Sequence, residues 1–488
     1  MTRERVEVAV VGGGPVGLMV ACELALAGVG VSVFERRTER VSQSRALSLH
    51  PRSLEVLALR GLADRFMARG QRLPLGHYAA LETRLDFSVL ETAFPFSLFI
   101  PQTVTEALLE ARARELGVDI RRGHLLTRLE QFPEEVHLEG TCGGGTFHAA
   151  ARYVVGADGA RSAVRTLAGI AFPGADATMS LMLGDIVLSE PLPQPALVVS
   201  NLKGVLMIAP LGDGLHHRAV VLDPERTGVP VSEPVTLEEL AGSVRAIAGT
   251  DFGMKAPFWL SRFGNETRHA ATYRDGRVFL AGDAAHVHLP AGGQGLNVGL
   301  QDAMNLGWKL VGVLRGWAPE PLLDSYQHER HPVGAHLIQN TLSQSALLYA
   351  THPAGQALRA AMSKLLTLPT ANRMLAEQIS AFDVAYPDPV LPAPPGMAAE
   401  PGVTGKRLPD FALHCEDGVT RTLYSLLHEG RWLMLRRPSA GGPASQAVPW
   451  GRWTSTVVAE PQGGPEELRP WPSLLVRPDG RVGYVARA

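Results

Sequence analysis

The sequence predicts an α/β fold in which a Rossmann-like nucleotide-binding domain is interrupted by a strand-rich insert and followed by a small C-terminal domain. Three observations predict it. A glycine-rich turn joins a strand to a helix near the start of the chain, short apolar strands recur over residues 175–265, and prolines gather over residues 386–402. The predicted boundaries are 1–174 and 266–385 for the discontinuous nucleotide-binding domain, which includes a helical segment over 303–385, 175–265 for the insert, 386–402 for a linker and 403–488 for the C-terminal domain.

The glycine-rich turn has the spacing of a dinucleotide fingerprint, carried by Gly12, Gly14, Pro15 and Gly17. An apolar strand over residues 6–11 enters the turn, and an apolar helix over 18–27 leaves it. The first glycine permits a tight turn, the second lets the backbone approach a pyrophosphate, and the third lets the helix pack closely on the strand. Glu35, about 20 residues past the middle glycine, is placed to accept a hydrogen bond from a ribose hydroxyl. The alternative is a glycine-rich turn with nothing bound.

The remaining elements follow in chain order from the same kinds of pattern. A helix is expected through Leu54, Leu57 and Leu62 and another over 104–116, because their apolar residues recur at helical spacing. Apolar runs bounded by turn residues predict strands over 153–155, 181–188, 196–200, 204–211, 219–222 and 278–281. A long helix is expected over 296–314, and the C-terminal domain should contain strands over 432–435 and 473–476.

Composition excludes several classes of partner. The 488 residues are 45% hydrophobic and 19% charged, and the formal net charge of −2 offers no basic surface for nucleic acid or anionic lipid. No apolar run is long enough to cross a membrane. The three cysteines, Cys22, Cys142 and Cys415, form no Cys-x-x-Cys pair, which favours a reducing compartment. We therefore expect a cytoplasmic protein whose partners are small molecules.

Two predicted strands end in small residues and a carboxylate, Asp158 after Gly156-Ala157 and Asp283 after Gly282. A carboxylate at the tip of a strand in an open α/β sheet lies at the edge where ligands bind, and it can accept hydrogen bonds from polyol hydroxyls. The alternative for either residue is a turn carboxylate that caps backbone amides. His286 and His288 follow closely, but no cysteine or clustered carboxylate completes a ligand set, so no metal site is expected.

Taken in order, these motifs resemble the three signatures of the class A FAD-dependent aromatic hydroxylases, whose fold is typified by para-hydroxybenzoate hydroxylase. They are the glycine-rich turn, the Asp158 motif with Arg161, Ser162 and Arg165 behind it, and the Asp283 motif with Pro290 and residues 292–297 behind it. Residues 259–264, 305–310 and 477–480 resemble the branch that oxidises polycyclic aromatic polyketides and rifamycin antibiotics, rifampicin monooxygenases included. The resemblance covers nearly the whole chain. It implies that the C-terminal domain is thioredoxin-like, lacks redox cysteines and has a structural role.

The same resemblance implies FAD as the cofactor and assigns its binding to residues of all three motifs and of two loops. The implied FAD-binding residues are Gly12, Gly14, Pro15, Gly17, Glu35, Arg36, Arg45, Gln102, Asp158, Asp283, Pro290, Gly293, Gly295, Leu296 and Asn297. Arg45, Asp158 and Arg165 would meet a transiently bound nicotinamide, for which no second glycine fingerprint is present. Arg45 and Pro290 would take part in catalysis.

The loop over 290–297 has a physical basis for this role. Its glycines open a long helix, so unpaired N–H groups and the positive end of the helix dipole suit the negative charge of a reduced flavin. The alternative is an ordinary glycine-rich helix entry. Tyr78, Met207 and Phe258 fall in segments that line the substrate in related enzymes, although each is at least as often a core residue, and the sequence identifies no general base.

The resemblance implies a single-component monooxygenase. NADPH or NADH would reduce FAD, O2 would form a C4a-hydroperoxyflavin, and the distal oxygen would pass to a polycyclic aromatic polyketide or a rifamycin-like antibiotic. The alternatives are Baeyer–Villiger insertion by the same chemistry, a flavin-bound protein that sequesters its ligand without oxygenation, and a flavin reductase that does not use O2. A biosynthetic or a resistance role, and a monomer or a homodimer, are all compatible with the sequence.

Overall fold

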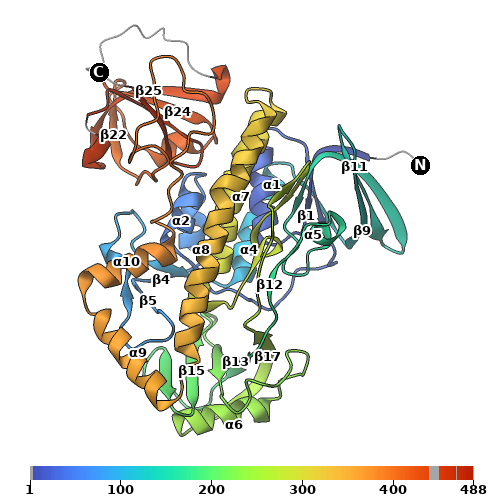
Figure 1. Ribbon diagram of the computed structural model, residues 1–488, viewed down its shortest axis with the longest axis vertical. Helices are drawn as coiled ribbons and strands as arrows, with labels where there is room; N and C mark the ends of the chain where they lie inside the picture. Colours follow the sequence, from blue (N-terminus) through green and yellow to red (C-terminus); the bar gives the residue numbers. More distant parts are fainter. Residues whose placement is uncertain (1–3, 439–449, 469, 487–488) are drawn as a thin grey trace.

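The structure is a computed structural model that describes residues 4–438, 450–468 and 470–486. Figure 1 shows three regions along the long axis: a small β-rich domain at the top left, a central part built around two long helices, and a second sheet at the bottom. The chain starts in the central part, passes through the bottom sheet, returns, and ends in the small domain. The central part therefore joins segments that are far apart in sequence.

The main sheet has a core of parallel strands, which are apolar except for the edge strand β8 (Asp119–Arg122). In spatial order these strands are β20 (Val278–Leu280), β11 (Gly145–Gly156), β1 (Glu4–Val11), β2 (Val31–Glu35) and β8. Val10 of β1 pairs with Val155 on one side and Val33 on the other, and all three are buried. Antiparallel extensions are β19 (Arg274–Asp275) and the hairpin β9 (His124–Gln131) with β10 (Val136–Cys142).

Three helices pack beside this sheet where helices were expected: α1 (Pro15–Leu26), α4 (Gln102–Glu115) and α7 (Gln294–Leu314). Helix α1 contacts both of the others. The prediction of a single helix through Leu54, Leu57 and Leu62 was wrong. The structure has two helices there, α2 (Pro51–Ala58) and α3 (Ala63–Met67). Gly61 lies between them with a φ of 67°, a left-handed conformation that ends a helix.

The insert is a five-stranded antiparallel sheet. Its strands, in spatial order, are β14 (Leu197–Asn201), β15 (Gly204–Pro210), β16 (His216–Leu222), β13 (Ser180–Val187) and β17 (Lys255–Gly264). Helix α6 (Leu237–Ala248) packs on it and was not expected. Its capping signal is nevertheless in the sequence, since the Thr236 hydroxyl accepts from the Glu239 amide and Gly249 ends the helix with a φ of 84°.

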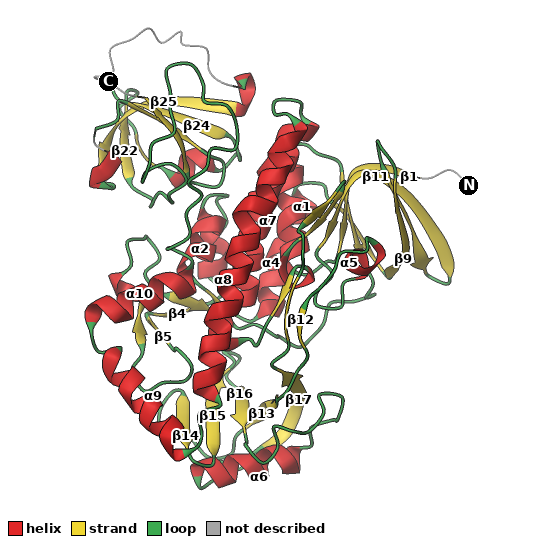
Figure 2. Ribbon diagram, in the orientation of Figure 1, coloured by secondary structure: helices red, strands yellow, loops and turns green. Residues whose placement is uncertain are grey.

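Figure 2 shows the remaining helices, of which α8 runs through the centre of the molecule. They are α5 (Ala163–Leu167), α8 (Asp324–Leu348), α9 (Pro353–Leu365) and α10 (Pro369–Ser380). Short strands form smaller sheets: β3 (Ser48–Leu49), β4 (Gln71–Leu73), β5 (Leu75–Gly76), β6 (Leu85–Asp86), β7 (Ser97–Phe99), β12 (Gly174–Ala175), β18 (Thr267–His269) and β21 (His286–Val287). Short 3-10 helices are η1 (Phe87–Val89), η2 (Gly282–Ala284), η3 (Ala291–Gly293) and η4 (Glu320–Leu323).

The C-terminal domain is a six-stranded sheet. Its strands are β23 (Thr420–Thr422), β22 (Ala412–Cys415), β25 (Thr454–Gln462), β24 (Trp432–Arg436), β26 (Ser473–Val476) and β27 (Val482–Ala486), in spatial order. Its described helical turns are η5 (Tyr424–Leu427), η6 (Gly451–Trp453) and η7 (Glu466–Leu468), all of the 3-10 type. The described residues of this domain contain no α-helix, so the structure does not confirm the thioredoxin-like detail.

The proline-rich segment over 386–402 forms neither helix nor strand, yet it is not free of the domains. Tyr386 and Leu391 are buried. Ala398 exchanges two backbone hydrogen bonds with Val485, and the Tyr484 hydroxyl donates to the Leu391 carbonyl. Proline removes backbone donors, so the segment packs through carbonyls and apolar surface rather than through a ladder.

Buried ion pairs fasten the C-terminal domain to the central part. Arg477, from the turn between β26 and β27, donates to both carboxylate oxygens of Glu329 on α8 at 2.7 and 2.9 Å. Lys309 of α7 lies 2.8 Å from the same carboxylate, and all three side chains are buried. Burial alone would raise the pKa of Glu329, but Arg477 and Lys309 hold it well below its usual range. Nearby, Arg60 pairs with Glu23 and donates to the carbonyl of Pro478.

We expect Glu329→Gln to lower the free energy of unfolding by about 3–5 kcal/mol, because buried Lys309 would lose its carboxylate partner and Arg477 would keep only Asp479. A carboxyl group whose pKa is lower in the folded than in the unfolded protein stabilises the fold at neutral pH. The difference in free energy of unfolding between wild type and Glu329→Gln should therefore narrow as pH falls below about 4. Urea denaturation measures both effects. The control is Glu320→Gln, which removes an exposed ion pair to Arg274 and should cost less than about 1 kcal/mol. Equal effects of the two variants would contradict a special role for the buried cluster.

Candidate functional site

The carboxyl edge of the parallel sheet collects the motif residues. Gly12 follows β1, Glu35 ends β2, Asp158 lies just beyond β11, and Asp283 lies just beyond β20. These four strands are neighbours and run in the same direction, so their carboxyl ends meet at one edge. Three segments separated by more than a hundred residues thereby form one candidate site.

The first glycine-rich turn is tightly built around one open position. A Cβ on Gly12, whose φ is 110°, would lie 2.3 Å from the Ala157 carbonyl oxygen, and a Cβ on Gly17 would lie 2.0 Å from the Gly12 carbonyl oxygen. A Cβ on Gly14 would meet nothing within 4 Å. Pro15 is the first residue of α1, whose N-terminus has no side-chain cap and no acidic residue in its first turn. An uncapped helix start beside an open glycine fits the pyrophosphate of a dinucleotide.

Glu35 is buried at the end of β2 and binds the turn directly. One carboxylate oxygen accepts from the Gly13 amide at 2.7 Å, and the other accepts from the Arg37 amide at 2.9 Å. The backbone therefore fixes the orientation of this carboxylate beside the fingerprint glycines. Arg36, next in sequence, is exposed.

Asp158 caps a helix, as its alternative interpretation foresaw. Its Oδ2 accepts from the amides of Ala163 and Val164 at 2.7 and 3.2 Å, while Oδ1 is buried without a partner in the described structure. Burial raises the pKa of Asp158. Arg165 is also buried and connects this motif to the third one, because its guanidinium donates to the carbonyls of Ala160 and Ala284 at 2.9 Å.

The third motif forms the N-terminus of α7. Gly292 and Gly293 have φ values of 71° and 65°, and α7 begins without a side-chain cap or an acidic first turn. The buried Asn297 donates to the carbonyls of Gly293 and Ser48, and its Oδ1 accepts from the His50 amide at 2.7 Å. The His50 ring bonds to the Gly292 carbonyl at 2.8 Å, and burial lowers its pKa to about 4. A neutral His50 therefore donates from Nε2 and holds the glycine turn.

The exposed side of this loop carries the other predicted residues. A Cβ on Gly295 would lie 3.6 Å from Asp283 Oδ1 and 3.2 Å from His288 Nε2, so these three positions lie together. Asp283 and Pro290 are exposed, and Leu296 is half-buried. The structure thus brings Asp283 and the start of α7 to the same surface.

Arg45 lies in a loop that two other parts of the chain hold. Gln102 accepts from the Ala46 amide at 3.1 Å through Oε1 and donates to Glu106. Arg218 of β16 donates to the carbonyls of Ser44 and Arg45 while it makes a bidentate pair with Asp185 at 2.7 and 2.8 Å. The Arg45 side chain itself is exposed. The insert therefore fixes the backbone of this loop and leaves the guanidinium of Arg45 at the surface.

A buried carboxylate supports the Asp283 motif from behind. Asp302 of α7 accepts from the Gly282 amide at 3.1 Å, from His286 at 2.9 Å and from Arg330 of α8 at 2.7 Å. Burial would raise the pKa of Asp302, but Arg330 and His286 hold it below its usual range. His286 is thus a hydrogen-bonded interior residue, and the described part of the chain has no cluster of residues suited to a metal ion.

The three predicted substrate residues do not share one environment. Tyr78 is buried in an apolar cluster with Leu289 and Ala291, and Met207 packs against that cluster. Phe258 is 48% exposed on β17 and faces His216 at a ring distance of 5.4 Å. The structure therefore brings Tyr78 and Met207 together near Leu289 and Ala291, but not Phe258.

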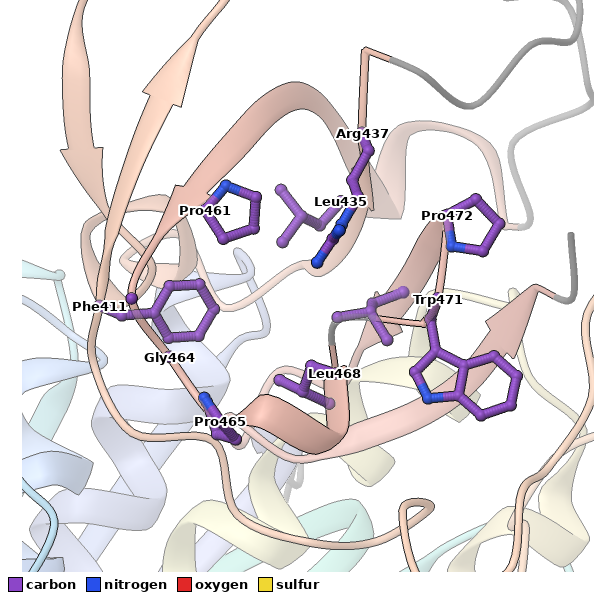
Figure 3. Close-up of a pocket in the computed structure, with 11 residues that line it drawn as sticks. Phe411, Leu435, Arg437, Pro461, Gly464, Pro465, Leu468, Trp471 and Pro472 are labelled. Atoms are coloured by element: carbon purple, nitrogen blue, oxygen red, sulfur yellow. The ribbon is translucent and has the colours of Figure 1, made fainter.

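A surface pocket lies elsewhere, in the C-terminal domain (Figure 3). Its empty volume is about 360 Å³, open solvent included. It is lined by Phe411, Leu435, Arg437, Pro461, Gly463, Gly464, Pro465, Leu468, Trp471, Pro472 and Leu474. None of these is a predicted site residue. None of the described helices is long and apolar enough to cross a membrane.

His50, Arg218, Asp302 and Arg330 are contacts that the sequence did not reveal. Each is a single polar residue without a motif of its own; His50, Arg218 and Asp302 bond to backbone elsewhere in the chain, and Arg330 bonds to Asp302. No local pattern could have identified them.

Comparison with known proteins agrees with this geometry. Residues 5–341 match the FAD binding domain family, and residues 401–488 match the aromatic-ring hydroxylase C-terminal family. The uncharacterized aromatic compound monooxygenase YhjG of Bacillus subtilis is 47% identical over 483 residues, which cover 99% of this chain and 94% of that protein. A rifampicin monooxygenase of Streptomyces venezuelae is 43% identical over 480 residues, covering 98% and 94% of the two chains.

A solved structure extends the agreement to three dimensions. OxyS anhydrotetracycline hydroxylase from Streptomyces rimosus superposes with a TM-score of 0.89 at 41% identity, covering 99% of this chain and 96% of that one. The resemblance predicted from the three motifs is confirmed. The chain belongs to the FAD-binding aromatic hydroxylase family and is a flavoprotein monooxygenase.

Proposed function

We propose that this monooxygenase consumes NADPH or NADH and O2 to insert one oxygen atom into a polycyclic aromatic polyketide or a related antibiotic. The observation that carries the proposal is the packing at the uncapped start of α7: Ser48 and His50, which follow the Arg45 loop, bond to Asn297, and Leu289 and Ala291, just before α7, belong to the Tyr78 cluster. Full-length similarity to a rifampicin monooxygenase and to an anhydrotetracycline hydroxylase supports a large fused-ring substrate.

In this proposal most of the predicted residues have a defined task. The backbone at Gly14 and the start of α1 receive the pyrophosphate, and Glu35 accepts from a ribose hydroxyl. Asp283 and Gly295 lie together and would meet the middle of the cofactor. The N-terminus of α7, with Pro290, Gly293, Leu296 and Asn297, would stabilise negative charge on the ring. Bound FAD supplies the transfer of electrons and the activation of oxygen.

The rest of the chain would orient the reactants and exclude water. Arg218 and Gln102 fix the backbone of the loop that carries the exposed Arg45. The guanidinium could therefore meet a phosphate of the nicotinamide dinucleotide without movement of the loop backbone. The cluster around Tyr78 and Met207 offers apolar surface for aromatic rings. Burial raises the pKa of Tyr78, which keeps its hydroxyl protonated as a hydrogen-bond donor. We further propose that the C-terminal domain, whether or not it is thioredoxin-like, has a purely structural role.

The first test is NADPH and NADH consumption in air by the FAD-loaded protein, with anthraquinones, angucyclines, tetracycline precursors and rifamycins as candidates. We expect at least one compound to accelerate consumption and to gain one oxygen atom by mass spectrometry. The product structure then distinguishes hydroxylation from Baeyer–Villiger insertion. Tight binding without acceleration across the panel would instead favour a ligand-sequestering flavoprotein, and turnover without O2 would favour a reductase.

We expect Arg45→Ala to slow reduction of the flavin by NADPH about tenfold or more, because a cation that orients the dinucleotide would be lost. The melting temperature should not change, since the guanidinium is exposed. Anaerobic stopped-flow absorbance measures the reduction. Arg128→Ala, an exposed arginine in the β9–β10 hairpin, is the matched control. Unchanged kinetics in Arg45→Ala would remove this residue from the site.

Asp158 allows its capping and functional roles to be separated. Asp158→Ala should lose the bonds to two amides at the start of α5, whose N-cap is Ser162, at a cost of about 1 kcal/mol, and also slow flavin reduction and weaken FAD binding. Asp158→Asn keeps an acceptor for the two amides, so we expect near-normal stability with slow reduction. Thermal unfolding and stopped-flow reduction of both variants provide the comparison. Normal reduction in the asparagine variant would leave Asp158 a structural cap only.

A further inference from the structure

The turn that follows Tyr78 has an unusual backbone. The Tyr78 carbonyl accepts from the Leu81 amide at 2.9 Å, and the two residues between them, Ala79 and Ala80, both have a φ of 50°. Turns with two positive φ values are dominated by glycine, asparagine and aspartate, because a Cβ is crowded in this conformation. Two alanines in succession therefore make a strained turn, which persists only where the surroundings hold it.

Two buried side chains hold this turn. Arg359 of α9 donates to the carbonyls of Ala79 and Ala80 at 3.0 and 2.7 Å. Gln344 of α8 accepts from the Ala79 amide at 3.1 Å through Oε1. Arg359 is 4% exposed and Gln344 is fully buried. The central backbone groups of the turn are thus bonded to side chains from helices more than 260 residues away.

The guanidinium of Arg359 is committed to backbone carbonyls. Besides the turn, it donates to the Leu347 carbonyl at 2.8 Å, and no described aspartate or glutamate forms an ion pair with it. Burial lowers its pKa. Burying a cation without a carboxylate partner costs free energy. Because this guanidinium donates to carbonyls of both α8 and the turn, it fixes the distance between α8 and the turn.

The same side chains connect the turn to the flavin loop. The Gln344 amide donates to Asn340 Oδ1 at 2.8 Å, and Gln294 donates to that same oxygen at 3.0 Å. Gln294 also donates to the Ala291 carbonyl at 3.1 Å. A Cβ on Gly292 would lie 3.2 Å from the Gln344 amide nitrogen, so this glycine packs directly on Gln344. We call Arg359 and Gln344 together the clamp. A continuous chain of polar contacts therefore links Ala79 to the start of α7.

We propose that Arg359 and Gln344 are positioning residues that hold the strained Ala79–Ala80 turn, and with it Tyr78, at a fixed place relative to the loop Ala291–Gly293. This inference rests on the proposed function, in which Tyr78 lines the aromatic substrate and that loop faces the flavin. The clamp would set where an aromatic ring lies relative to the flavin. Loss of the clamp lets the turn relax to an unstrained conformation and displaces Tyr78.

Glycine provides the decisive comparison, because it adopts a positive φ without a Cβ penalty. Four proteins are needed: wild type, Arg359→Met, Ala79→Gly with Ala80→Gly, and the three substitutions combined. Anhydrotetracycline and rifampicin serve as probes, with binding followed by the flavin absorbance change. We expect Arg359→Met to raise the Kd of a bound probe about tenfold. The combined variant should return to within about threefold of wild type, since its turn keeps its shape unaided.

Two further measurements separate positioning from general damage. The Kd for FAD, measured by titrating apoprotein, should be the same in all four proteins, and product formed per NADPH consumed should fall in Arg359→Met and recover in the combined variant. Equal loss of FAD and probe binding would overturn the inference. So would an Arg359→Met defect that glycine does not reduce.

Thermal unfolding of the same four proteins tests the clamp without any substrate. The destabilisation caused by Arg359→Met should be larger in the glycine background, because relaxation of the strained alanine turn offsets part of the lost hydrogen bonds and a glycine turn has no such strain to release. Additive effects would overturn the clamp itself. If neither probe binds wild type or is oxidised while this coupling is present, the proposed substrate class fails and the substrate half of the inference fails with it. If a probe binds wild type but Arg359→Met and the glycine substitutions have additive effects, the inference is wrong while the proposed function stands.

Discussion

Parallel pairing of β1 with β2 and β11 is the constraint on which the candidate site depends. Because the three strands point the same way, the turn after β1, the carboxylate of Glu35 and the turn after β11 arrive at one edge. The pairing is close enough that Gly12 abuts the Ala157 carbonyl, which no residue with a Cβ could do at that φ. Strand β20 then adds Asp283 to the same edge, and α1 and α7 start there. Sheet direction, more than any single contact, brings the predicted cofactor-binding residues together.

Helix α8 extends this arrangement in two directions through neighbouring residues. Glu329 pairs with Lys309 and with Arg477 and so links α8 to the C-terminal domain. Arg330 pairs with Asp302, which holds the Gly282 amide behind the Asp283 motif. Further along the same helix, Gln344 holds the turn beside Tyr78. One long helix therefore supports the domain interface, the Asp283 motif and the turn after Tyr78.

The sequence was sufficient for features encoded locally. The glycine spacing around Gly12, the strand tips at Asp158 and Asp283, and the helix entry at Gly293 each have a pattern with a physical reason, and the structure brings them to one edge. Other contacts at the site have no such pattern. The roles of Arg218 and Gln344 become visible only in the structure, where each side chain bonds to backbone that is far away in sequence. The break at Gly61 and helix α6 were missed although their signals were present. Phe258 shows the converse, since a segment-level resemblance does not determine which way one side chain faces.

The buried charges also explain why the C-terminal domain is more than an appendage. Arg330 donates to the Tyr386 hydroxyl, and the guanidinium groups of Arg477 and Arg481 lie 5.3 and 4.2 Å from the centre of that ring. Without Arg477, the carboxylate of Glu329 would keep Lys309 and Asn305 but lose one of its two cations, and buried charges that lose a partner are costly. Since Arg330 also binds Asp302, a change in how the C-terminal domain docks would reach the backbone of the Asp283 motif through two side chains. The domain interface and the support of the Asp283 motif thus depend on interior charges that lie around Tyr386.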